Sequence, residues 1–212
     1  MAVYDLEEQE QIDEFKAWWK QYRGLIFLVI AVALLTAAAI QGWRYFSSKQ
    51  TFEAGELYTQ LQGAAAGGDS KRVRDIAAVL VEKYPRTGFA TFAALAAAKA
   101  AFESGESGTA ATLLRWAVDK GRDDPTREIA RLRLAGVLLD EGKHDEALKL
   151  LAEQHSESMT ALYADLKGDV LVAAGKPAEA RAAYQLALDR SEARSAYRAL
   201  VQMKLDALGA AK

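Results

Sequence analysis

The sequence contains no cysteine and only two histidines. The absence of cysteine excludes disulfide bonds, thiolate metal sites and a cysteine nucleophile, but it leaves the cellular compartment open. His144 and His155 lie eleven residues apart, which is not the three- or four-residue spacing of a helical metal pair. A phosphate-binding glycine loop and a Gly-x-Ser-x-Gly nucleophile motif are also missing. We therefore expect no metal, no cofactor and no enzymatic activity.

The charge distribution shows no basic excess. The net charge is -2, and residues 1–23 carry three basic and six acidic side chains, which leaves 24 basic and 23 acidic side chains in the rest. Nucleic-acid binding normally requires a basic surface, so it is not expected. Alternating apolar and polar residues and β-branched clusters are missing as well. An all-α fold follows.

One long apolar run is present, the nineteen uncharged residues from Gly24 to Gly42. As a helix this run is about 28 Å long, close to the thickness of the hydrocarbon core of a bilayer. Aromatic residues suited to the two membrane interfaces flank it: Trp18, Trp19, Tyr22, Trp43 and Tyr45. We predict a transmembrane helix at 24–43, with membrane lipid as its partner. A cleaved signal peptide and a buried core helix are the alternatives.

The flanks of this run give two further expectations. Lys16, Lys20 and Arg23 on one side, against two basic residues on the other, weakly favour a cytoplasmic N-terminus. In the N-terminal segment 1–23, apolar residues recur at helical spacing, and the resulting face is either an interfacial or docking helix or a solvated extension of the span.

The remainder of the chain contains a repeated pattern. Gly105, Gly142 and Gly175 each end a helical run, with a small residue seven positions before and an alanine five positions after. Small residues allow two antiparallel helices to approach closely, and glycine can adopt the left-handed conformation that terminates a helix. The pattern predicts helical hairpins that stack into an α-solenoid and resembles tetratricopeptide repeats (TPR). An irregular helix bundle is the alternative.

The expected organisation is an N-terminal segment (1–23), the transmembrane helix (24–43), a helical extension or connector (44–68) and a TPR-like domain (69–212). Eight helices are predicted in this domain, the last as a cap of the stack: Arg72–Tyr84, Phe89–Ser104, Thr109–Lys120, Thr126–Asp140, Asp145–Gln154, Met159–Ala174, Ala178–Arg190 and Arg194–Leu208.

A stack of hairpins presents its first helices on a concave face that commonly holds a peptide. In the repeat register above, the residues predicted to line a protein-binding groove are Phe92, Lys99, Phe102, Leu132, Asp140, Asp165, Asp169 and Val172. Packing between hairpins is an equally good explanation for any one of them.

Four stretches resemble the ancillary SecYEG translocon subunit family of Gram-negative bacteria, the YfgM type. They are MAVYDLEEQEQIDEFKAWWKQYRG at the start, GWRYF at 42–46, ADLKGDVLVAAGKPAEARAAY at 164–184 and VQMKLDAL at 201–208. The resemblance implies a single-pass inner-membrane protein with a cytoplasmic N-terminus and a periplasmic TPR-like domain. It also implies association with the SecYEG translocon, a PpiD-type periplasmic chaperone and newly translocated polypeptides, and a link from the cytoplasmic tail to an envelope stress regulator.

The sequence therefore favours a non-enzymatic ancillary subunit of the Sec translocon that acts through protein–protein contacts. The alternative is a membrane-anchored TPR scaffold in envelope assembly or cell division, since the same anchor and repeats would serve that role.

Overall fold

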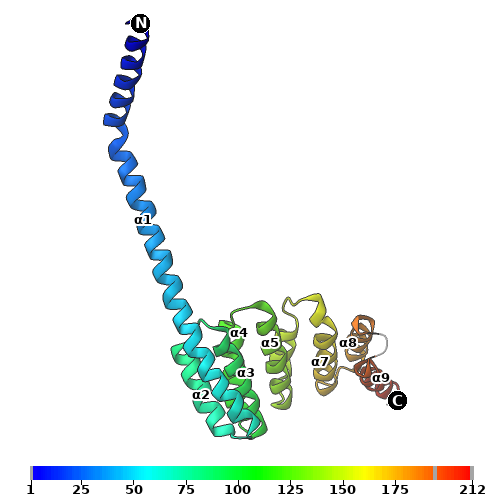
Figure 1. The fold of residues 1–212 in the computed structure, drawn as a ribbon. Coiled ribbons are helices and arrows are strands. Elements are labelled where there is room, and N and C mark those ends of the chain that lie inside the picture. Colours follow the sequence, from blue (N-terminus) through cyan, green and yellow to red (C-terminus); the bar gives the residue numbers. More distant parts are fainter. Residues whose placement is uncertain (1, 193–194, 211–212) are drawn as a thin grey trace. The chain divides into compact units, whose positions relative to one another are not determined.

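The computed structural model of the protein describes residues 2–192 and 195–210, which form helices and no strand (Figure 1). The all-α prediction is confirmed. Contacts divide the chain into two units, Met1–Lys49 and Gln50–Lys212. The elements are α1 (Ala2–Ala66), α2 (Ser70–Lys83), α3 (Gly88–Glu103), α4 (Ser107–Lys120), α5 (Asp124–Asp140), α6 (His144–Leu151), the short 3₁₀-helix η1 (Glu157–Met159), α7 (Thr160–Ala173), α8 (Pro177–Arg190) and α9 (Ala196–Ala210).

The first unit is the N-terminal part of α1, and it contains a stretch long and apolar enough to cross a membrane. Its large apolar side chains are exposed around the helix, for example Leu28, Leu34 and Leu35 at 61%, 65% and 71%. The hydroxyl of Thr36 donates to the carbonyl oxygen of Val32 at 2.8 Å, so this polar group is satisfied within the helix, as a bilayer requires. The predicted interface residues are all exposed on α1: Trp18, Trp19, Tyr22, Trp43 and Tyr45.

The second unit is a series of antiparallel helical hairpins. The three predicted hairpins are present as α3–α4, α5–α6 and α7–α8, and each turns at a glycine with positive φ: Gly105, Gly142 and Gly175. At the first of these turns, the amide of Glu106 donates to the carbonyl of Ala101 at 2.9 Å, the long bond of a Schellman motif. The equivalent amides of Lys143 and Lys176 make the same bond. The same turn, with a positive-φ glycine and the same backbone hydrogen bond, therefore closes all three hairpins.

A further hairpin precedes these three. Gly68 has φ +72°, and the amide of Asp69 donates to the carbonyl of Ala64 at 2.9 Å, the same closure as in the repeats. Residues 50–66 of α1 pack against α2 and α3 through Ala54, Leu61 and Val73, among other buried residues. The helical unit therefore includes most of the segment that the sequence analysis assigned to a connector.

The sixth helix is shorter than predicted, since α6 ends at Leu151 and not at Gln154. The carboxylate of Glu128 accepts hydrogen bonds from the amide and the hydroxyl of Ser156, at 2.8 and 2.6 Å. Because Glu128 is buried at 8% exposure, these bonds hold the loop before η1 against α5. The predicted start of the last helix at Arg194 lies outside the described residues.

The last helix, α9, occupies the position of a first helix of a repeat. Tyr163 of α7 donates its hydroxyl to the carbonyl of Glu128, and Tyr197 of α9 donates to that of Ala161, at 2.8 and 3.1 Å. Glu128 and Ala161 stand fourteen residues before the turn glycines Gly142 and Gly175, so the two bonds are equivalent between successive repeats. The helix thus continues the stack as the predicted cap.

Candidate protein-binding site

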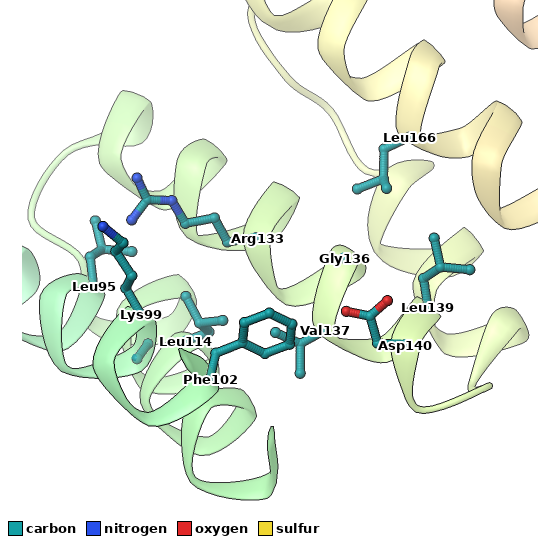
Figure 2. A pocket seen from close by; sticks show the side chains of 11 residues that line it. Leu95, Lys99, Phe102, Leu114, Arg133, Gly136, Val137, Leu139, Asp140 and Leu166 are labelled. Carbon is teal, nitrogen blue, oxygen red and sulfur yellow. The ribbon is translucent and has the colours of Figure 1, made fainter. Parts of the chain in front are cut away.

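The first helices of the hairpins lie next to one another, with α3 in contact with α5 and α5 with α7. Between α3 and α5 lies a groove of about 490 Å³, a volume in the range of ligand pockets. Figure 2 shows its side chains arriving from both helices. We call it the α3–α5 groove, and it is lined by Leu95, Ala98, Lys99, Phe102, Leu114, Arg133, Gly136, Val137, Leu139, Asp140 and Leu166.

The lining is mostly apolar, and the charges stand at its rim. Lys99 makes an exposed ion pair with Glu103 at 3.5 Å, which contributes little because both side chains are solvated. Arg133 and Asp140 are exposed and have no hydrogen-bond or ion-pair partner among the described residues. Phe102 is 40% exposed, so its ring adds apolar surface to the groove. The groove therefore offers apolar contact flanked by one free cation and one free anion.

The helix that carries these charges has a fixed start. The carboxylate of Asp123 accepts hydrogen bonds from the hydroxyl and the amide of Thr126, at 2.6 and 2.9 Å, and so caps α5. These bonds hold the pKa of Asp123 below its usual value. Arg133, Gly136, Val137 and Asp140 follow on one face of α5 at helical spacing.

Three of the eight predicted groove residues line this groove: Lys99, Phe102 and Asp140. Phe92 is exposed near the start of α3 with its ring 6.1 Å from that of Tyr58, and Val172 is exposed near the end of α7. Leu132 is partly buried against the core. These three residues lie on first helices but outside the groove.

Asp165 and Asp169 face α9. Lys204 of α9 donates to both carboxylates, at 2.8 and 2.7 Å, and the Tyr184 hydroxyl donates to Asp169 at 2.7 Å. Burial on its own lowers the pKa of Lys204, but the hydrogen bonds and charges of the two carboxylates outweigh it, and the pKa is raised. Burial, followed by the bond to Asp169, raises the pKa of Tyr184. This cluster joins the cap to the stack, and we name it the α7–α9 cluster.

Sequence reasoning missed eight of the eleven lining residues, among them Arg133, Gly136 and Val137 on α5. On α5 it selected Leu132, one position from the face that lines the groove. The helical spacing from Arg133 to Asp140 would have identified that face. Among the described residues, no cluster of histidine or acidic side chains is suited to bind a metal ion.

Comparison with known proteins places relatives along nearly the whole chain. Residues 16–210 match the family model described as a tetratricopeptide repeat-like domain. An ancillary SecYEG translocon subunit of Neisseria gonorrhoeae is 30% identical over 209 residues, which cover 98% of this chain and 100% of the relative. Proteins of the same name from Haemophilus influenzae and Escherichia coli are 29% identical over 188 residues and 27% identical over 211 residues. These alignments cover 87% and 98% of this chain, and 90% and 99% of the relatives.

Proposed function

Because this chain belongs to the family of the ancillary SecYEG translocon subunits and carries its TPR-like domain, we propose that it is a non-enzymatic accessory factor of the Sec translocon. The observation that carries the proposal is the exposed, apolar α3–α5 groove within a repeat fold whose relatives are named for translocon association. A groove of this kind binds protein segments through shape and apolar burial, and it needs no catalytic group.

The partners follow from the same proposal. The first is the SecYEG translocon itself, which the names of the relatives specify. Beyond it, the TPR-like domain contacts a periplasmic chaperone of the PpiD type or polypeptides that have just crossed the membrane. The N-terminal segment, on the cytoplasmic side of the membrane, is the part that contacts an envelope stress regulator.

Photo-crosslinking in intact membranes tests this function. A photoreactive residue at Phe102, in the groove, is expected to capture translocon subunits, a chaperone or a translocating chain. The same residue at Thr112, exposed on α4 and outside the groove, serves as the matched control. Capture of none of these partners from Phe102 would contradict the proposal, and capture of division or outer-membrane assembly proteins would favour the scaffold alternative.

The proposed topology is a single pass through the inner membrane with the N-terminus in the cytoplasm and residues 50–212 in the periplasm. The exposed apolar surface of α1 supports the membrane placement. A reporter enzyme that is active only after export, fused after Lys212, is expected to be active in cells. Activity of a cytoplasm-dependent reporter at the same position would reverse the orientation.

A further inference from the structure

Gly136 lies inside α5, where the fold gives no reason for a glycine. Glycine is the least favourable helix-interior residue after proline, so it usually marks a close contact. A Cβ atom built on Gly136 meets nothing within 4 Å. At Gly168, by contrast, a Cβ atom would lie 2.3 Å from the ring of Tyr184, so packing explains that glycine. The absence of a side chain at Gly136 therefore serves something other than internal packing.

The repeat register supports this conclusion. Gly136 stands six residues before its turn glycine, and the equivalent positions of the neighbouring hairpins carry Lys99 and Asp169. A side chain is thus compatible with the fold at this position. Gly136 lines the α3–α5 groove together with Ala98 of the opposite helix. In Figure 2 no side chain rises from α5 at Gly136, next to the side chain of Val137. The two small residues open the groove for a close approach to the α5 backbone.

The lining of the groove decides the conformation of its occupant. The backbone amides and carbonyls of α3 and α5 are used within those helices, and the groove is otherwise lined mainly by apolar side chains. An extended segment would find no edge to pair with and would leave its own backbone groups unsatisfied. An α-helix satisfies them internally and presents only side chains. The occupant that fits is therefore helical.

The charges specify the sequence of that helix. Arg133 and Asp140 are seven residues apart, so they lie about 10.5 Å apart along α5 and on the same side of it. A helix packed alongside α5 spans the same distance between its own positions i and i+7. We propose that the α3–α5 groove binds an amphipathic helix with an acidic residue at i, apolar residues at i+3 and i+4, and a basic residue at i+7. This inference rests on the proposed function and names the chemistry of its partner.

The test uses the full-length protein in lipid nanodiscs and a labelled alanine-based peptide of sixteen residues containing EAALLAAK. Wild-type protein is expected to bind this peptide and not the same peptide with both leucines replaced by serine.

Gly136→Ala is expected to weaken binding about tenfold or more, because the methyl group blocks the close approach. The same substitution is expected to raise Tm by about 1–4 °C, since alanine is the better helix former. If Gly136→Ala instead damaged the fold, both the affinity for the peptide and the Tm would fall.

Two further measurements test the helix and its charges. A peptide with proline in place of the alanine before the first leucine keeps the charges and both leucines but cannot form the helix, and it is expected not to bind. The double variant Arg133→Glu, Asp140→Lys is expected to lose binding of this peptide. It is expected to bind the charge-swapped peptide containing KAALLAAE, which keeps both leucines and places lysine at i and glutamate at i+7. Equal binding of the proline peptide, or unchanged binding by Gly136→Ala, would overturn the inference.

The proposed function can fail separately. If a photoreactive residue at position 102 captures translocon partners with undiminished yield when Gly136 is alanine, the proposed function stands and the helix-docking inference is wrong. If a photoreactive residue at position 102 captures no partner in the otherwise wild-type protein, the proposed function is wrong, whether or not the peptide binds.

Discussion

Replacing Gly168 with alanine is expected to destabilise the helical unit by about 2–3 kcal/mol, because the new methyl group overlaps a buried ring. The Cβ atom would lie 2.3 Å from Cε1 and 2.5 Å from Cδ1 of Tyr184. Tyr184 is 3% exposed, and its hydroxyl is bound to Asp169, so the ring has little room to move. The gain in helix propensity offsets only part of this loss. Thermal unfolding of the full chain should show a fall in Tm of roughly 5–10 °C.

The matched control comes from the chain itself. In the first two predicted hairpins this pair of positions holds alanine with leucine, Ala98 with Leu114 and Ala135 with Leu151, where the third holds Gly168 with Tyr184. Tyr184→Leu alone leaves a cavity beside Gly168 and is also expected to destabilise. The double variant Gly168→Ala, Tyr184→Leu restores the pair used elsewhere and should be more stable than either single variant. A neutral or stabilising Gly168→Ala would contradict the packing described here.

These recurring pairs explain why the hairpins were predictable from the sequence. Small residues at the helix crossing and glycine at the turn follow from local geometry, which leaves a periodic trace. The hairpin at Gly68 was missed because Leu61 and Val73 occupy the positions that are small elsewhere. Only the shared turn geometry and the packing of residues 50–66 against α2 and α3 identify it.

The groove was predictable only in part. Its helices could be named from the repeat, but a shift of one position on α5 moves a side chain about 100° around the axis, from the groove at Arg133 to the core side at Leu132. The role of Asp165 and Asp169 could not be read at all, because their partner Lys204 lies 39 and 35 residues away in sequence. In the sequence, an aspartate on the first helix of a hairpin gives the same pattern whether its carboxylate faces solvent or pairs with the capping helix α9.

Lys204→Met is expected to destabilise the junction of α7 and α9 by about 2–3 kcal/mol. The substitution keeps much of the side-chain volume but leaves Asp165, at 9% exposure, without its cation. Removing one partner of a buried ion pair costs more than replacing both, because a desolvated charge remains. Adding Asp165→Leu, which places leucine where α3 has Leu95, should therefore recover much of the loss. Urea unfolding of the full chain measures both steps, and a further loss in the double variant would contradict this account.

The dependence of this loss on pH separates the charge of Lys204 from its packing. The pKa of Lys204 in the folded protein is raised above its ordinary value of 10.5, so its contribution is complete below pH 10.5 and declines as pH rises through the raised pKa. The pKa values of Tyr184 and Tyr197 are raised as well, chiefly by burial, so the junction also weakens above pH 10 in the variant. The wild type should lose stability more steeply than Lys204→Met above pH 10.5, and their difference should shrink. A difference that stays constant from pH 7 to 12 would mean that packing of the alkyl chain, and not the ammonium charge, holds the cap.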